Sequence, residues 1–144
     1  MNPETRSPNE PIENLAIGTI IEVDGTHIVA ELDSRILELS RVFAGDVYPI
    51  GQFGSIVKIH FGRRLIYGYV SRLRMKSEYE REKGIIESNP STSTARIIEA
   101  DLFGEGEWIL SGEIESKNWS LYFERGVSNF PLPQQIVYLT PKSG

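Results

Sequence analysis

Alternating apolar and polar residues run through most of the chain from residue 17 onward. The first such stretch places one apolar set before an Asp-Gly pair and a second set after it, namely Ile17, Thr19, Ile21 and Val23, then Ile28, Ala30 and Leu32. Asp-Gly between two such runs is typical of a type I′ hairpin turn, because both central positions of that turn need a positive φ. A turn centred on Asp24-Gly25 places Glu22 opposite His27, so we expect His27 to be a surface ion-pair partner rather than a metal ligand.

Further strand signals follow after a long connection. Residues 34–52 have no clean period, and we expect them to form a crossover rather than a hairpin, with at most one helical turn at 36–41. Later strands are expected at residues 53–59, 64–75, 95–103, 108–114, 121–123 and 136–139. A tight turn at Phe61-Gly62 or Gly62-Arg63 joins the first two of these, and residues 104–106 are expected to form a turn that interrupts a strand.

These strands predict an all-β protein, a small closed or partly open β-barrel of six or seven strands, because Gly and Pro lie at the joints and helical periodicity is almost absent. Residues 1–14 contain three prolines among polar residues and predict a disordered N-terminal tail, since they cannot bury enough apolar surface. The barrel domain is expected to span residues 15–141. Within it, residues 76–93 are expected to protrude as an insertion loop, where Ser77 is placed to cap a short helix.

Charge is distributed unevenly along the 144 residues. The formal net charge is −5, yet residues 58–83 hold eight basic and three acidic side chains, a local excess of five positive charges. Three interpretations of this basic segment remain open: a nucleic-acid-binding face, a patch complementary to an acidic partner or neighbouring subunit, or a solvated strand edge whose charges prevent aggregation.

The candidate partner-binding residues are cationic or apolar and fall at expected turns and strand faces. They are Arg63, Arg64, Arg72, Arg74, Lys76, Phe130 and Leu132. The arginines are able to form charge-assisted hydrogen bonds with carboxylates or phosphate groups of a partner. The apolar loop at residues 130–133 is either an exposed interface anchor or a buried plug at the end of the barrel.

Motifs for catalysis are weak in this sequence. There is no Gly-Lys pair for a phosphate-binding loop, no Gly-x-Ser-x-Gly nucleophile elbow and no cysteine. Glu99 and Asp101 share one strand face, where we expect solvent exposure rather than a magnesium site. We therefore expect no catalytic, metal-ligating or cofactor-binding residues in this chain.

The location of the protein is also suggested by composition. No apolar run approaches the roughly 18 residues of a membrane span, and the first residues lack the basic and apolar regions of a signal peptide. The absence of cysteine fits a reducing compartment. We expect a soluble, cytoplasmic protein without membrane contact.

Three stretches resemble, in order and spacing, the amino-terminal barrel of HerA-type ATPases. They are VYPIGQFGSIVKI (47–59), RRLIYGYVSRLRM (63–75) and FERGVSNFPLPQQIVYL (123–139). GTIIEVDGTHIVAELD (18–33) and RIIEADLFGEGEW (96–108) fit the same module, which is called the HAS-barrel. The resemblance covers about residues 16–140 and implies the HAS-barrel fold.

In this family the barrel precedes a RecA-like motor domain that carries the phosphate-binding loop and forms a hexameric ring on DNA. The resemblance implies that ATP, magnesium and DNA are bound by a motor domain outside this sequence, so the whole protein would be an ATP-hydrolysing DNA translocase or helicase. The barrel itself would not be an enzyme. It would support ring assembly and dock an effector, either a NurA-like nuclease in DNA repair or a sirtuin-like NADase in antiviral defence. A nucleic-acid-binding barrel that uses residues 58–83 is the alternative.

Overall fold

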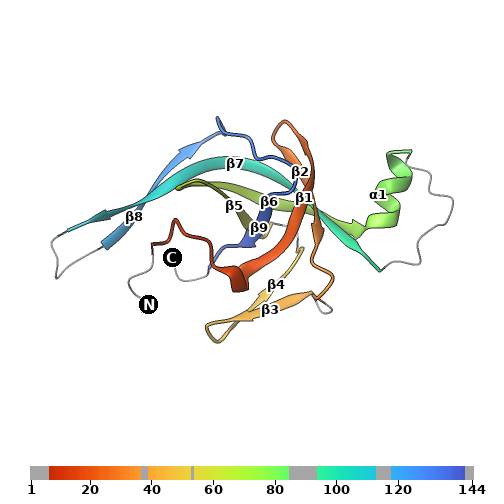
Figure 1. Cartoon of the computed structure of the whole chain (residues 1–144), viewed down its shortest axis with the longest axis horizontal. Coiled ribbons are helices and arrows are strands. Elements are labelled where there is room, and N and C mark those ends of the chain that lie inside the picture. Colours follow the sequence, from red (N-terminus) through yellow and green to blue (C-terminus); the bar gives the residue numbers. More distant parts are fainter. Residues whose placement is uncertain (1–6, 37–38, 53, 85–93, 113–117, 142–144) are drawn as a thin grey trace.

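The computed structural model describes residues 7–36, 39–52, 54–84, 94–112 and 118–141, and within them nearly all regular structure is β-strand (Figure 1). In chain order the elements are η2 (Glu13–Leu15), β1 (Ala16–Asp24), β2 (His27–Leu32), β3 (Ser40–Phe43), β4 (Asp46–Pro49), β5 (Ile56–Phe61), β6 (Arg64–Met75), α1 (Lys76–Glu82), β7 (Arg96–Ser111), β8 (Asn118–Arg125) and β9 (Ile136–Leu139). This composition confirms the predicted all-β class.

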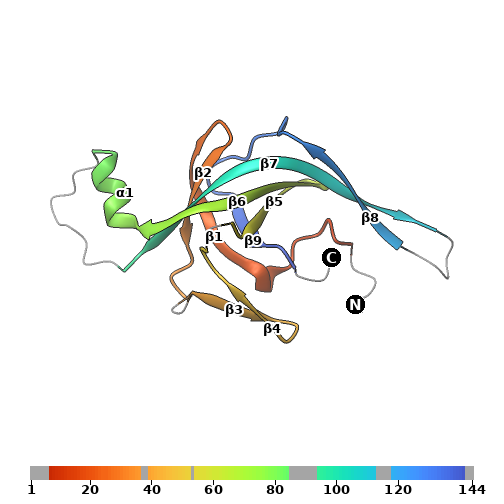
Figure 2. The same ribbon diagram turned by 180° about the vertical axis from the view of Figure 1, so that it is seen from behind.

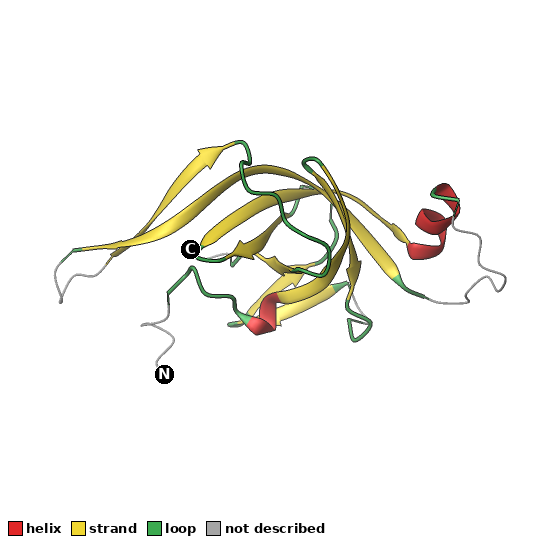
Figure 3. Ribbon diagram, turned by 45° about the horizontal axis from the view of Figure 1, so that its top comes forward, coloured by secondary structure: helices red, strands yellow, loops and turns green. Residues whose placement is uncertain are grey.

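Pairing of the second strand with the seventh closes the main sheet. The strand order is β2-β1-β9-β5-β6-β7-β8, and β2 also pairs with β7, so six antiparallel strands form a closed barrel. β8 is an extra strand outside this ring, and together with the end of β7 it forms an arm that extends away from the barrel (Figures 1 and 2). The strong curvature of β6 and β7 is visible in Figure 3. The predicted small barrel is therefore confirmed in its closed form.

The turn of the β1–β2 hairpin lies one residue later than predicted, so the strand pairing next to it differs by two residues: Val23 faces Ile28 and not Thr26. Asp24 pairs with His27, so Gly25 and Thr26 are the two turn residues. Gly25 has a φ of 60°, whereas Thr26 has no positive φ, which is the pattern of a type II′ turn with glycine at its first central position. The prediction of a type I′ turn centred on Asp24-Gly25 is wrong, because a single positive φ is enough here.

A β-bulge in β1 changes which side chains face the core. The pairing of β1 with β2 shifts between Ile20 and Glu22, so Ile21 is the extra residue. Ile20 is fully buried in the main core inside the barrel, and Ile21 packs against a second apolar cluster on the outer face. That second cluster consists of Val29, Tyr79 and Ile97. The predicted single apolar face of this strand is therefore split between two clusters.

Two segments expected to be turns or irregular are strands. Residues 40–49 form the two-stranded sheet of β3 and β4, so the expected crossover contains a hairpin instead of a helical turn. β7 runs through residues 104–106 without a break. Gly104 lies under the ring of Phe123, and a side chain at Gly106 would meet the backbone oxygen of Tyr122. These glycines allow β8 to approach closely and do not mark a turn.

Several local predictions agree with the structure. β6 and β9 have the predicted bounds, and the turn between β5 and β6 is Gly62-Arg63. β5 begins at Ile56, and the expected strand residue 53 lies outside the described residues. The short helix α1 is present, but its N-cap is Met75 and no side chain caps it, so the role expected of Ser77 is wrong. Residues 85–93 of the expected insertion lie outside the described residues.

Residues 7–14 differ from the loose tail expected for residues 1–14, because they are held against the barrel. The side chain of Asn9 donates to the carbonyl oxygen of Trp108 (2.8 Å) and accepts from its N–H (2.8 Å), while the backbone oxygen of Asn9 accepts from Nδ1 of His60 (2.8 Å). β6 pairs with β7 only as far as Gly106, so Asn9 takes over the backbone groups of β7 just beyond that point. Residues 1–6 lie outside the described residues.

Asn9→Ala is expected to lower the free energy of unfolding by about 2 kcal/mol, because it leaves a backbone donor and acceptor of Trp108 without partners. Urea denaturation measures the change. Asn14→Ala is the matched control, since Asn14 is exposed in the same segment. Equal stability of the two variants would show that Asn9 does not hold this segment in place.

Candidate interaction surfaces

Arg74, one of the expected partner-binding residues, is buried within the chain's own charges. Its side chain is only 7% exposed and forms ion pairs with Glu82 (Nη1 to Oε2, 2.8 Å) and Glu99 (Nε to Oε2, 3.0 Å). Burial opposes its charge, but the two carboxylates outweigh this effect and raise the pKa of Arg74. The prediction that Arg74 is an exposed contact residue is wrong, because its position beneath α1 brings these carboxylates against it.

The neighbouring cations Arg72 and Lys76 are less enclosed. Nζ of Lys76 lies 2.6 Å from Oε1 of Glu31, and its side chain is one-third exposed. Arg72 is 53% exposed, and its Nε lies 4.0 Å from Oε2 of Glu99. Of the three cations at the junction of β6 and α1, Arg72 therefore offers the most open charge.

Tyr79 fastens α1 to the outer face of the barrel. Its ring is buried in the second apolar cluster, and its hydroxyl donates to Oε1 of Glu22 (2.8 Å). Burial and the hydrogen bond to Glu22 raise the pKa of Tyr79 to about 12. Nζ of Lys83 lies 3.0 Å from the same Glu22 oxygen, so the Glu22 carboxylate contacts both Tyr79 in α1 and Lys83 at the C-terminal end of α1.

His27 lies between two carboxylates of β7, not opposite Glu22 as predicted. Its Nε2 is 2.8 Å from Oε1 of Glu99, and its Nδ1 is 3.0 Å from Oδ1 of Asp101. Burial disfavours the charged ring, but the hydrogen bonds to Asp101 and Glu99 outweigh it and raise the pKa of His27. His27 is thus an ion-pair partner, as expected, with different partners. Glu99 is only 12% exposed, so the expectation of a solvent-exposed carboxylate there is wrong.

The basic segment 58–83 is largely neutralised by acidic groups of the same chain. The cations in ion pairs are Arg64, Arg72, Arg74, Lys76 and Lys83. Arg63 and Arg81 are exposed and form no ion pair with a described residue, and Lys58 is buried. Because most of the charge is already compensated, the nucleic-acid interpretation loses its main electrostatic support.

A second charge cluster closes one end of the barrel around Glu105. This carboxylate is 2% exposed and accepts from Nη2 of Arg64 (2.9 Å), from the N–H (3.1 Å) and hydroxyl (2.8 Å) of Ser128, and from the N–H and Nδ2 of Asn129 (3.1 Å each). Burial would raise the pKa of Glu105, but the bonds from Ser128, Asn129 and Arg64 outweigh it and lower that pKa. The cluster fixes the loop that follows β8.

This loop presents two apolar side chains to solvent. Phe130 is 46% exposed and Leu132 is 64% exposed, whereas Pro131 between them is buried. The N–H of Leu132 donates to Oε1 of Gln135 (2.6 Å), which holds the loop in shape. The sequence left two interpretations of this loop open, an exposed interface anchor and a buried plug at the barrel end. The side chains of Phe130 and Leu132 are exposed, as in the first interpretation, and only Pro131 is buried, as in the second.

The arm of β7 and β8 is an apolar surface that the sequence analysis missed. Exposed apolar side chains lie on both of its faces: Leu110 (41%), Leu121 (37%) and Phe123 (43%) on one, and Ile109 (37%) and Tyr122 (67%), beside Glu107 and Glu124, on the other. β8 pairs with β7 on one side, and its other edge pairs with no strand in the described part of the chain. The available signal is the pair of glycines at 104 and 106, which the sequence analysis assigns to a turn. In the structure Gly106 pairs with Phe123, and the ring of Phe123 covers Gly104. The arm thus combines a free strand edge with apolar side chains.

Compared with known proteins, the sequence matches no family model and no curated protein. The described residues contain no group of three or more His, Asp or Glu side chains placed to hold a metal ion. Neither helix in the described ranges has the length and apolar character needed to cross a bilayer. The expectations about cofactors, catalysis and location remain predictions.

The raised pKa of His27 predicts a pH-dependent stability. A histidine whose folded pKa lies above its usual 6.5 stabilises the fold fully below that value, and the stabilisation is lost as the pH rises through the folded pKa. His27→Gln is therefore expected to lower the free energy of unfolding by up to about 1 kcal/mol near pH 5.5. Near pH 8.5 the loss is expected to be smaller than at pH 5.5. Thermal melts of both proteins at the two pH values test this. A deficit that grows with pH would contradict the assigned ion pairs.

Glu105→Ala is expected to lower the free energy of unfolding by about 3 kcal/mol, because Arg64 and two backbone N–H groups lose a buried acceptor. Chemical denaturation measures the loss. Glu124→Ala is the control, since Glu124 lies 4.0 Å from the same Arg64 but is 74% exposed. The cluster has no structural role if both variants are equally stable.

Proposed function

We propose that this chain is a non-catalytic interaction module, the amino-terminal HAS-barrel of a HerA-type DNA translocase. In this role it supports assembly of a ring and docks an effector, a NurA-like nuclease or a sirtuin-like NADase. The ordered resemblance of residues 47–59, 63–75 and 123–139 to that family supports the proposal. The closed small barrel is compatible with it.

The observation that carries the docking role is the free edge of β8. This strand lies outside the closed ring, and its second edge has no partner strand among the described residues. Tyr122 is 67% exposed on it, and the loop with Phe130 and Leu132 begins where β8 ends. An edge of this kind is able to accept a strand from another chain, while exposed aromatic and aliphatic residues supply pockets and anchors.

The distribution of charge supports a protein partner over a nucleic acid. Arg63 and Arg72 retain exposed side chains and can add charge-assisted contacts to an acidic partner. Arg64, Arg74 and Lys76 already contact carboxylates of this chain, so they contribute to the fold before they contribute to docking. The remaining open cations are few, and a phosphate backbone needs several.

Tyr122→Asp is expected to weaken effector binding at least tenfold, because it replaces the most exposed aromatic side chain of the free edge strand β8 by a charge. Isothermal titration of the purified chain against the NurA-like or sirtuin-like protein from the same organism measures the affinity. Val42→Asp is the matched control, since Val42 is also 67% exposed but lies on β3. Circular dichroism checks that both variants keep the β-fold.

Equal affinity of the two variants would exclude β8 as the docking surface. Binding of duplex DNA by the wild-type chain, with an affinity that falls steeply between 50 and 200 mM salt, would favour the nucleic-acid alternative instead. Sedimentation of the chain, alone and with the effector, separates self-association from docking.

A further inference from the structure

Lys58 is a buried cation without a counter-ion. It lies in β5 with an exposed fraction of 4%, and no carboxylate of the described residues forms an ion pair with it. Glu105 is the other buried charge for comparison, and its carboxylate accepts hydrogen bonds from five donors. Lys58 has no equivalent acceptor set among the described residues, although a largely buried cation is stabilised by one.

Aromatic side chains surround Lys58 on the outer face of the barrel. In the strand registers it lies directly opposite Tyr67 of β6 and Tyr138 of β9, so all three side chains share one face. His60 lies on the same face of β5, and its ring meets that of Tyr138 edge-on at 5.1 Å between centroids. The walls around the ammonium are therefore aromatic. Their polar atoms are the tyrosine hydroxyls and Nε2 of His60, which makes no hydrogen bond within the described residues.

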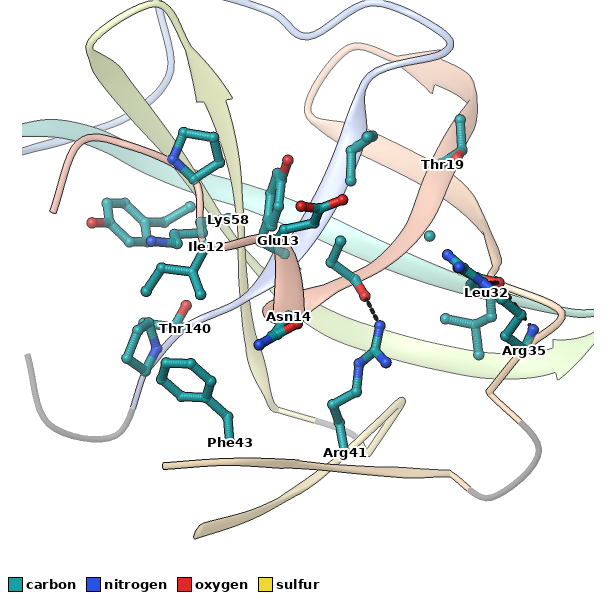
Figure 4. Close-up of a pocket in the computed structure, with 18 of the residues that line it drawn as sticks. Ile12, Glu13, Asn14, Thr19, Leu32, Arg35, Arg41, Phe43, Lys58 and Thr140 are labelled. Carbon is teal, nitrogen blue, oxygen red and sulfur yellow. Dashed lines mark hydrogen bonds and ion pairs between the residues drawn. The ribbon is translucent and has the colours of Figure 1, made fainter. Parts of the chain in front are cut away.

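The side chain of Lys58 lines a long groove of about 1710 Å³ between the barrel and the N-terminal segment. Ile12 and Glu13 of that segment lie beside Lys58, and Phe43 and Thr140 lie farther along the groove (Figure 4). Glu13 is exposed, and its carboxylate forms no ion pair with Lys58. The ammonium is therefore accessible from the groove and still uncompensated.

A second unused donor lies in the same groove. Arg41 of β3 donates from Nη2 to the backbone oxygen of Ala16 (2.7 Å), but its buried Nε makes no hydrogen bond within the described residues. Figure 4 shows this guanidinium projecting into the groove from the β3 side. Two cationic side chains with unused donors thus face this groove. Its lining also includes the carboxylates of Glu13, Glu31 and Asp33, whereas the walls next to Lys58 are the aromatic rings of Tyr67 and Tyr138. The Lys58 end therefore has the composition of a site for an anion with an apolar body.

We propose that this groove binds a small molecule bearing a carboxylate or phosphate group, with the anionic group at the Lys58 ammonium and an apolar or aromatic body against the walls. The anion supplies the acceptor that Lys58 lacks, and the rings of Tyr67 and Tyr138 accommodate a flat body. The Lys58 end of the groove lies beside the segment of residues 7–14, whereas other lining residues, Ile21 and Glu31, contact α1. It does not depend on the docking role proposed for β8.

Benzoate, acetate and inorganic phosphate are suitable probes. In chloride-free buffer at pH 7, saturating benzoate or phosphate is expected to raise the melting temperature by several degrees, as for any ligand that binds only the folded state. Lys58→Met is expected to fold, to melt at or above the wild type without ligand, and to lose the shift. Lys83→Met is the matched control and keeps it, because Lys83 is paired with Glu22 on another face.

The probes also distinguish the chemistry of the ligand. A larger shift with benzoate than with acetate indicates an apolar body, and a larger shift with phosphate than with benzoate indicates a phosphate ligand. No shift with any probe, or an equal shift in Lys58→Met, overturns the proposal. Lys58→Gln repeats the test with a polar side chain if the methionine variant does not fold.

The pH dependence of binding gives an independent readout. Burial lowers the pKa of Lys58 to about 8, so affinity is expected to fall up to tenfold per pH unit above that value as the ammonium loses its proton. The other titratable groups facing Lys58 are Glu13, His60, Tyr67 and Tyr138. Burial, and then the charge of Lys58, lower the pKa of His60 to about 4, and burial raises the pKa of both tyrosines. Affinity that is unchanged between pH 7 and 9 would contradict the assignment.

Discussion

The pairing of β7 on both of its edges is the constraint on which the rest of the structure depends. Residues 97–101 of β7 pair with β2 and close the ring, residues 96–106 pair with β6, and residues 104–111 pair with β8. One strand can serve three neighbours only if it bends, and extra residues at Phe103 and Ser71 in the β6–β7 ladder allow this. Closure then removes every edge of the six-stranded ring and leaves β8 as the accessible edge of the main sheet, while β3 and β4 form a separate two-stranded sheet.

Closure also fixes where charge can reside. The interior takes the apolar side chains of the main core, so charged residues of β6 and β7 that do not lie at a barrel end must point outward. There the ladder brings Arg72 opposite Glu99, and α1 adds Glu82 against Arg74. The basic residues of β6 therefore lie against acidic residues of β7 and α1. Charges that looked like a binding patch in the sequence form ion pairs within the chain and help to hold α1 on the barrel.

The parts of the fold that the sequence predicted are those set by local patterns. β6 and β9 were predicted with correct bounds because their alternation needs no knowledge of their neighbours. The hairpin register was wrong because the turn consists of Gly25 and Thr26 and needs only one positive φ, and the bulge at Ile21 then shifts the pairing again. The continuity of β7 was missed because glycine is equally typical of a turn and of a close approach, and only the ring of Phe123 over Gly104 distinguishes them. The burial of Arg74 depends on Glu99, which is distant in sequence.

Glu105 and Lys58 show two outcomes for a buried charge in one small barrel. Glu105 is compensated by its own chain, so its burial fixes the loop that carries Phe130 and needs nothing from outside. Lys58 has no such set among the described residues, so part of the folding free energy is spent on an unpaired ammonium. An anion that enters the groove removes that cost, and this relief adds to its binding free energy. By linkage the same anion must stabilise the folded barrel, which makes Lys58 the point where ligand binding and folding are coupled.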